Sequence, residues 1–280
     1  MSPPVLILVS ILLGSIAGGL LLLRRYVRAL DAPASPIWYG EPQSETGFWR
    51  LGLGFSTCYL LPCKGGWLLI DTAFLKDYPR FLSGLKEAHI DPTELRYVVL
   101  THRHDDHAGF AGSLANEFGT AVLAHEQCFV ALDQGVKTSH ARPLKWFVPL
   151  TDLALALFME RGPVRAPLPP QTQRIFLKGD APDVLRALGI PATILWTPGH
   201  TSDSISVLLD DGSLFSGDAA SNLLNAIGAA YRPLYVADRG DLFASWRKVL
   251  DCGAKRVYPA HGLPFEATEL KRSMAEHEGG

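Results

Sequence analysis

The chain has 280 residues, of which 48% are hydrophobic and 19% are charged, and its formal net charge at pH 7 is −2. A chain of this length forms one large domain or two small ones. Because the charges nearly balance, the sequence has no basic footprint for nucleic acid, and we expect no nucleic-acid partner.

The first expected element is a membrane-spanning helix. Residues 4–23 carry no charge, and their length is about what a helix needs to cross a ~30 Å hydrocarbon core. A cleaved signal peptide is the alternative, but it normally has a basic segment before an apolar run of about 7–15 residues. Arg24, Arg25 and Arg28 all follow the apolar run. The positive-inside rule therefore predicts a single-pass protein of the cell (inner) membrane, anchored by residues 1–30, with its catalytic domain in the cytoplasm.

A linker and one catalytic domain are expected after the anchor. Residues 31–47 are rich in proline, serine and glycine, which is typical of a linker. Over residues 48–280, short apolar runs alternate with amphipathic segments, which predicts an α/β domain. The predicted strands cover residues 54–62, 66–71, 97–101, 121–125, 192–197, 204–209, 213–218 and 256–260. The predicted helices cover residues 78–90, 109–117, 126–134, 241–252 and 264–277.

Two hairpins in this domain have the same design. Residues 56–73 and 204–220 each contain an apolar strand, a tight turn with glycine, a second strand and an aspartate at its end. Each hairpin leads to a helix and then to an apolar strand that ends in a histidine, His102 or His261. If two such halves meet face to face, the strand ends gather at one edge, where ligands usually bind.

The stretch THRHDDHAGF, residues 101–110, combines three histidines with two aspartates. His102 and His104 are two residues apart just beyond a predicted strand, so their side chains are expected to point the same way. Asp106 and His107 follow across the next turn. Imidazole and carboxylate together suit zinc, manganese or iron, and the lack of nearby thiolates argues against a structural zinc-finger site.

The order of these residues resembles the metallo-β-lactamase superfamily, whose motif is H-x-H-x-D-H followed by a distant histidine, aspartate and histidine. The resemblance covers about residues 48–270, and the earlier strand-end Asp71 matches the first family motif. It implies a four-layer αβ/βα sandwich, in which two mixed sheets lie between helices. It also implies two metal ions. One would be held by His102, His104 and His200, the other by Asp106, His107 and His261, and Asp218 would bridge them.

The resemblance further implies the chemistry of the site. The expected cofactor is two Zn²⁺ per chain, with iron or manganese as alternatives, and the two cations would share an attacking hydroxide. Asp106 and Asp71 are the expected catalytic residues. Asp106 would orient the hydroxide and pass a proton to the leaving group, whereas Asp71 would fix ligand orientation by hydrogen bonding. Arg103 and Asp105 occupy variable positions of the motif, and we expect them to be solvated.

The expected function is that of a membrane-anchored binuclear hydrolase acting on an ester, thioester or lactone, as in the glyoxalase II and lactonase branch of this family. Relatives that hydrolyse β-lactams generally lack an aspartate at the position of Asp218, which disfavours that substrate. Ser221 stands where homoserine lactonases tend to have a tyrosine. The alternatives are a phosphodiesterase of the same fold, an iron-dependent oxidoreductase similar to persulfide dioxygenases, and a non-catalytic membrane scaffold.

An apolar insertion at about residues 136–172 separates the motifs. The simplest interpretation is a helix packed on the core, and the alternative is a lid that contacts the bilayer and favours acylated small-molecule substrates. Trp146 and Phe147 in this insertion are candidate substrate-binding residues. Phe110 is a third, because it stands where the family usually has the second of two glycines. No pattern in the sequence predicts an oligomeric state.

Overall fold

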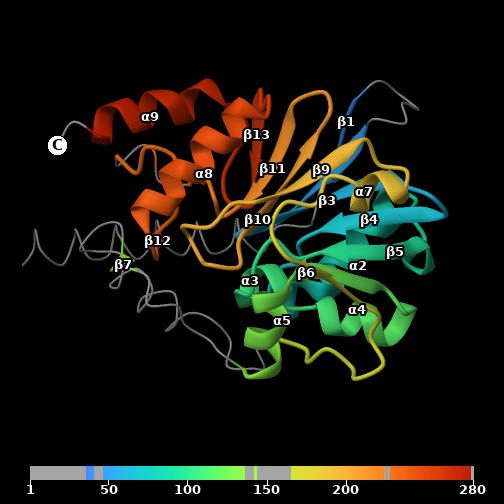
Figure 1. Cartoon of the computed structure of the whole chain (residues 1–280). Helices are drawn as coiled ribbons and strands as arrows, with labels where there is room; N and C mark the ends of the chain where they lie inside the picture. Colours follow the sequence, from blue (N-terminus) through green and yellow to red (C-terminus); the bar gives the residue numbers. More distant parts are fainter. Residues whose placement is uncertain are drawn as a thin grey trace, which may run out of the picture.

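The computed structural model describes residues 36–40, 47–135, 142–143, 165–223, 225 and 228–278. Its strands form two sheets and one short ribbon (Figure 1). The predicted membrane helix at residues 4–23 lies outside the described residues, as does most of the predicted insertion, with Trp146 and Phe147. Within the ranges given above, no helix has both the length and the apolar character needed to cross a membrane.

The first sheet has seven strands in the order β1-β2-β3-β4-β5-β6-β8. They are β1 (Pro36–Tyr39), β2 (Phe48–Leu53), β3 (Ser56–Cys63), β4 (Gly66–Ile70), β5 (Leu95–Val99), β6 (Ala121–His125) and β8 (Arg174–Leu177). Strands β1 to β4 are antiparallel, and β4, β5, β6 and β8 run parallel. The α-helices of this half are α2 (Tyr78–Glu87), α3 (Asp105–Ala108), α4 (Ala111–Phe118) and α5 (Glu126–Asp133), and the short 3-10 helices are η1 (Leu75–Asp77) and η2 (Pro92–Glu94).

The second sheet has five strands in the order β14-β13-β11-β10-β9. They are β9 (Ala192–Trp196), β10 (Ile205–Leu209), β11 (Ser213–Gly217), β13 (Arg256–Pro259) and β14 (Phe265–Glu266). The helices of this half are α7 (Val184–Ala187), α8 (Arg239–Asp251) and α9 (Thr268–Glu278). A separate two-stranded ribbon pairs β7 (Arg142–Pro143) with β12 (Tyr235–Val236) in antiparallel register.

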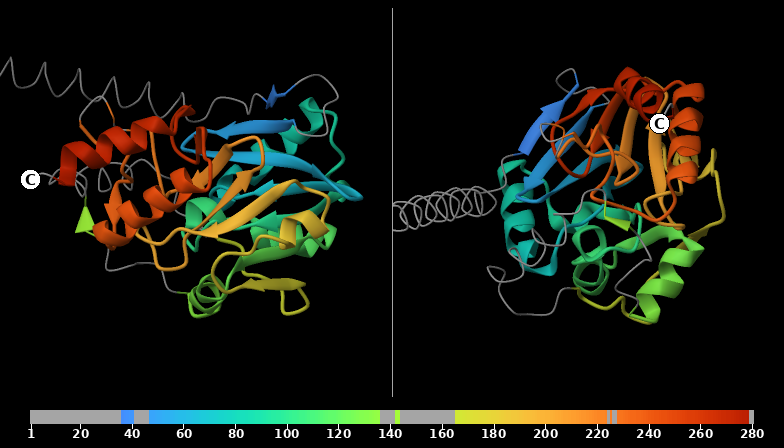
Figure 2. Two further views of the ribbon diagram at one scale, coloured as in Figure 1. Left: turned by 45° about the horizontal axis from the view of Figure 1, so that its top comes forward. Right: turned by 90° about the vertical axis from the view of Figure 1, so that its left-hand side faces the viewer.

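Three apolar clusters hold these layers together. One lies between the sheets and includes Tyr59 of β3 and Phe215 of β11. A second packs α2, α4 and α5 on the outer face of the first sheet, with Phe81 at its centre. The third packs α8 and α9 on the second sheet through Trp246 and Leu270. Figure 2 shows the resulting order, with the teal and green helices on one side of the sheets and the orange and red helices on the other. The protein therefore has a mixed α/β fold with two sheets.

The eight predicted strands correspond to β3, β4, β5, β6, β9, β10, β11 and β13. Both predicted hairpins are antiparallel pairs, β3 with β4 and β10 with β11. In each half, the second hairpin strand pairs in parallel with the strand that leads to a candidate histidine. Gly65 and Gly212 in the two turns have φ values of 79° and 98°, which favour glycine. The two halves of the chain thus repeat one arrangement.

The segment predicted as a linker contains a strand. Strand β1 pairs with β2 so that Trp38 lies opposite Trp49. Tyr39 stacks on Phe48 with ring centroids 5.4 Å apart and meets the ring of Tyr258 edge-on. This aromatic packing outweighs the proline and serine content of the segment, and β1 begins with a proline at the sheet edge, where a missing N–H is tolerated. The folded domain therefore also includes residues 36–40.

Candidate metal centre

The candidate ligands come together where strands of both sheets end. They follow β5, β9, β11 and β13, and two of them belong to the short helix α3. The ligand atoms form three overlapping sets, each compact enough to hold one ion: His102, His104 and His200; His102, His107 and Asp218; Asp106, His107 and His261. The structure thus brings all seven predicted ligands to one place.

The first group consists of three imidazole nitrogens from His102, His104 and His200. Nδ1 of His104 lies 3.0 Å from Nε2 of His102 and 3.0 Å from Nε2 of His200. The two Nε2 atoms are 3.2 Å apart. Ligands about 2.0–2.1 Å from a tetrahedral zinc lie about 3.3 Å from one another. The three nitrogens therefore have nearly the spacing that one such ion requires.

The second group combines carboxylate and imidazole. Nε2 of His261 lies 3.2 Å from Oδ2 of Asp106, and Nε2 of His107 lies 3.8 Å from the same oxygen. Asp218 stands between the groups. Its Oδ1 is 3.2 Å from Nε2 of His261 and 3.5 Å from Nε2 of His107, whereas its Oδ2 is 3.4 Å from Nε2 of His200. One carboxylate thus faces both groups, with a different oxygen toward each.

Two atoms of this cluster have no hydrogen-bond partner among the described residues: Nε2 of His107 and Oδ1 of Asp218. Both are buried, and an unsatisfied buried polar atom costs about 1–3 kcal/mol. Cations bound between these side chains would satisfy both atoms. The donor set, which is made of imidazole and carboxylate without thiolate, also suits borderline divalent ions. The residues present therefore fit a pair of divalent cations.

In three of the ligand histidines, the ring nitrogen that faces away from the cluster, Nδ1, lies within hydrogen-bond distance of an acceptor oxygen. Nδ1 of His200 lies 2.7 Å from the carbonyl oxygen of Tyr235, and Nδ1 of His261 lies 2.8 Å from that of Phe55. Nδ1 of His107 lies 2.8 Å from a carboxylate oxygen of Asp71. Because a carbonyl or carboxylate oxygen only accepts, each Nδ1 carries a hydrogen, and in the neutral form of each ring the lone pair is on Nε2, which faces the cluster.

Asp71 connects His107 to Thr101, which precedes His102 in the loop after β5. Its two carboxylate oxygens accept hydrogen bonds from the backbone N–H and the hydroxyl of Thr101, both at 2.7 Å. Strand β11 approaches this contact closely at Gly217, where φ is +50° and an added Cβ would lie 2.3 Å from Oγ1 of Thr101. Glycine at this position therefore leaves room for the Thr101 contact. The structure places Asp71 behind a ligand, and its part in catalysis stays a prediction.

Electrostatics differ between the two ligand groups: they favour the neutral imidazole in the first, whereas in the second nearby carboxylates outweigh burial and raise the pKa of His107 and His261. Burial lowers the pKa of His102, His104 and His200, and together with the neighbouring His200 it lowers that of His104 to about 3. These imidazoles are therefore neutral at pH 7. Burial would raise the pKa of Asp106, but His107 and His261 outweigh it and lower the pKa to about 2. This carboxylate is therefore ionised at neutral pH.

Arg103 and Asp105 are not simply solvated, which differs from the expectation. The side chain of Arg103 is only 11% exposed and pairs with Asp203, which is completely buried. Asp105 lies 3.2 Å from the guanidinium of Arg165, so it too is partnered. Sequence reasoning missed Asp203 altogether. The signal available was an arginine placed between two predicted metal ligands, since a charge that becomes buried beside them needs a partner.

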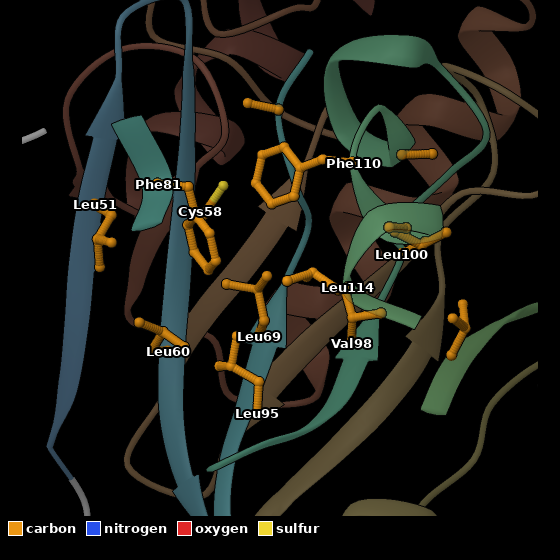
Figure 3. Close-up of a cluster of buried hydrophobic side chains, with 14 of the residues drawn as sticks. Leu51, Cys58, Leu60, Leu69, Phe81, Leu95, Val98, Leu100, Phe110 and Leu114 are labelled. Carbon is orange, nitrogen blue, oxygen red and sulfur yellow. The ribbon is translucent and has the colours of Figure 1, made fainter. Parts of the chain in front are cut away.

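Phe110 lies in the hydrophobic core (Figure 3). Its side chain is 0% exposed, and its ring lies 4.9 Å from that of Phe81 and 5.4 Å from that of Tyr78. This placement differs from the expected contact with substrate. The chain turns between α3 and α4 here, and the ring packs on α2 because the turn directs it away from the ligand cluster.

The sequence is similar to proteins of the metallo-beta-lactamase superfamily. A family model described as "Metallo-beta-lactamase superfamily" matches residues 51–261. The chain is 27% identical over 209 residues to "Beta-lactamase-like protein 2 homolog" of Drosophila melanogaster, a match that covers 74% of this chain and 59% of that protein. It is 29% identical over 171 residues to "Metallo-beta-lactamase fold-containing protein ST1585" of Sulfurisphaera tokodaii, covering 60% and 61%. The chain thus spans about three fifths of the length of these relatives.

Solved structures show the same fold. The metallo-beta-lactamase family protein TTHA1429 from Thermus thermophilus superposes with a TM-score of 0.57 at 21% identity, over 87% of this chain and 79% of that one. A B3 metallo-beta-lactamase with an active-site glutamic acid superposes with a TM-score of 0.55 at 21% identity, over 92% and 94%. At this identity the likeness concerns the fold alone.

Proposed function

This chain belongs to the metallo-beta-lactamase superfamily, and from that premise we propose that it is a binuclear metal-dependent hydrolase of small-molecule esters, thioesters or lactones. The position of Asp218 supports this most directly. Its Oδ1 faces His107 and His261, and its Oδ2 faces His200. A carboxylate that faces two ligand groups in this way is suited to bridging two ions. Zinc is the proposed metal, with iron or manganese as alternatives.

The side chains of the site have distinct parts in this proposal. When bound, the two cations supply Lewis acidity towards a carbonyl oxygen and lower the pKa of water towards neutrality. Asp106, ionised at neutral pH, accepts a proton from the attacking water and passes it to the leaving alkoxide or thiolate. Asp71 holds His107 in the tautomer whose Nε2 lone pair faces the cluster.

Apolar side chains beside the second ligand group support a substrate with an apolar portion. The ring of Phe55 lies 4.4 Å from that of His261, and Phe74 lies 6.4 Å from Phe55. Leu263, two residues after His261, is 67% exposed. Exposed apolar groups next to a reactive centre bind the apolar part of a ligand by burial. We therefore propose substrates with an acyl chain.

We also propose that residues 4–23 attach the enzyme to the cell membrane, with the catalytic domain in the cytoplasm. The support is the uncharged length of this segment and the three arginines that follow it. An acylated substrate delivered from the bilayer would be consistent with such attachment.

The test is turnover by the purified full chain loaded with Zn²⁺. The panel contains esters and thioesters of increasing acyl length, a lactone, a phosphodiester and a β-lactam. We expect hydrolysis of the acyl compounds and its loss in Asp218→Asn, which keeps the shape of the side chain and removes its charge. Asp251→Asn, at the exposed end of α8, is the matched control and should keep full activity.

Faster turnover of the β-lactam or phosphodiester than of every acyl compound would refute the proposed substrate class. Full activity of Asp218→Asn would refute the proposed role of the bridging carboxylate.

A further inference from the structure

We infer that the buried pair Arg103–Asp203 is a positioning device that sets the geometry of the first ligand group. The inference rests on the proposed function only in that the group is taken to hold a metal ion. Arg103 stands between the ligands His102 and His104, and Asp203 follows the third ligand, His200, by three residues. The pair therefore joins the two loops that supply all three ligands of one ion.

The residue between the first two ligands, Arg103, is held at its backbone N–H, its guanidinium Nη1 and its carbonyl oxygen. Its backbone N–H donates to Oδ2 of Asp203 at 3.0 Å, and its guanidinium Nη1 donates to Oδ1 of the same carboxylate. Its carbonyl oxygen accepts a hydrogen bond from Nη1 of Arg165 at 3.4 Å. One carboxylate thus binds both the main chain and the side chain of Arg103. Such a two-point contact restricts rotation of the peptide units on either side of it, and these lead directly to His102 and His104.

Stability alone does not explain why this ion pair is buried. Asp203 is 0% exposed, and burial together with this nearby carboxylate raises the pKa of the Cys128 thiol of α5. A buried ion pair contributes little net stability compared with apolar residues of similar size, and its best-attested role is to specify one arrangement. The arrangement specified here is the approach of the loop after β5 to the loop after β9.

The second ligand group has a separate set of supports. Asp71 holds His107, and the carbonyl oxygen of Phe55 holds His261. Neither support involves the Arg103–Asp203 pair. Loss of the pair should therefore weaken metal binding at the group His102, His104 and His200 while the other group is largely preserved.

The test measures Co²⁺ affinity of the full chain by chelator competition, with each ligand group isolated in turn. His261→Ala leaves the first group as the intact one, and His104→Ala leaves the second. Into each background we introduce Arg103→Met together with Asp203→Leu, because removing only one partner would leave a buried charge. In the His261→Ala background we expect Co²⁺ affinity to fall about 10–100-fold, the usual effect of removing a residue that orients a metal ligand. In the His104→Ala background we expect it to fall less than about 3-fold.

Three further variants keep the test decisive. Arg186→Met together with Asp210→Leu removes an exposed arginine–aspartate pair and should leave both affinities unchanged. If the buried double variant does not fold, Asp203→Asn should lower first-group affinity in the same direction. Arg103→Lys, which keeps the charge but not the planar fork, should retain part of the wild-type affinity.

Equal losses of affinity in both backgrounds would overturn the inference and assign the pair a general structural role. Unchanged affinity in the first background would overturn it as well. Because the readout is metal affinity, failure of the chain to hydrolyse any acyl compound would refute the proposed function without changing either of these outcomes.

Discussion

Asp71→Asn should reverse the tautomer of His107. The carboxylate of Asp71 accepts three hydrogen bonds, from the N–H and hydroxyl of Thr101 and from Nδ1 of His107, all within 2.8 Å. An amide has one oxygen that accepts and an NH₂ group that donates. If its oxygen stays on the Thr101 N–H, its NH₂ group faces Nδ1 of His107. That nitrogen can then only accept, so the hydrogen moves to Nε2.

The consequence falls on metal binding more than on folding. A hydrogen on Nε2 of His107 points towards Asp106 and Asp218 and removes the lone pair that a cation needs. We expect about 10–100-fold weaker metal affinity at the second ligand group. The free energy of unfolding of the metal-free chain should fall by only about 1–3 kcal/mol, the value of one hydrogen bond to a charged group.

Two measurements check this prediction. Nitrogen-15 NMR of labelled histidine reports which ring nitrogen of His107 carries the hydrogen, and chelator competition reports Co²⁺ affinity in the His104→Ala background. Asp77→Asn, which alters a buried aspartate paired with Arg80, is the control and should change stability without changing affinity. A hydrogen that remains on Nδ1 in Asp71→Asn, or an unchanged affinity, would refute the reasoning.

Three further predictions follow from the structure, and a fourth follows from the apolar N-terminal sequence. Removal of bound Zn²⁺ with a chelator should lower Tm, since a ligand at 1,000 times its Kd contributes about 4 kcal/mol, and calorimetry of Asp218→Asn should show a smaller shift. In the metal-free chain the pKa of Asp106 is about 2, because His107 and His261 outweigh the effect of burial. The stability that its ionised form contributes is therefore complete above the usual pKa of 3.8 and is lost as pH falls towards 2. In this pH window, the free energy of unfolding of Asp106→Asn, measured in urea, should depend less on pH than that of the wild type. The same pH dependence in both chains would contradict this. Phe110→Ala should cost about 3–5 kcal/mol in urea unfolding while the ratio of kcat/KM for long and short esters stays constant, and a changed ratio would restore Phe110 as a substrate contact. A chain lacking residues 1–30 should be recovered in the soluble fraction after lysis, whereas the full chain should sediment with membranes and resist extraction at alkaline pH.

The ligands could be predicted because their spacing is local and their residue types are distinctive. His102, His104 and His107 follow one strand, and each later ligand also stands at a strand end. The supports behind the ligands could not be predicted in the same way. Asp203 lies 100 positions from Arg103, and Phe55 lies 206 positions from His261. These contacts arise only when the two sheets pack.

Hydrogen bonds from a ligand histidine to a main-chain carbonyl are even harder to predict from a sequence. The carbonyl oxygens of Tyr235 and Phe55 orient His200 and His261, and every residue has a carbonyl. The strands that sequence patterns missed are explained in part by their short length. Strands β1, β8 and β14 lie at sheet edges and have only four, four and two residues, so each gives little pattern from which a strand can be recognised. Position in the sheet does not explain every case, since the inner strand β2 was also missed and the edge strand β9 was recognised from its apolar run.

The division of ligands between the two halves of the chain has a consequence for folding order. The first group takes His102 and His104 from the loop after β5 but His200 from the loop after β9, and the second joins Asp106 and His107 to His261. Neither half alone supplies three ligands to one ion. A cation can therefore bind tightly only after the sheets have docked, unlike the ion of a zinc finger, which organises a single short segment. In a chain that binds metal as proposed, dissociation of the metal and separation of the two halves would be linked equilibria, and a higher free metal concentration would oppose the separation.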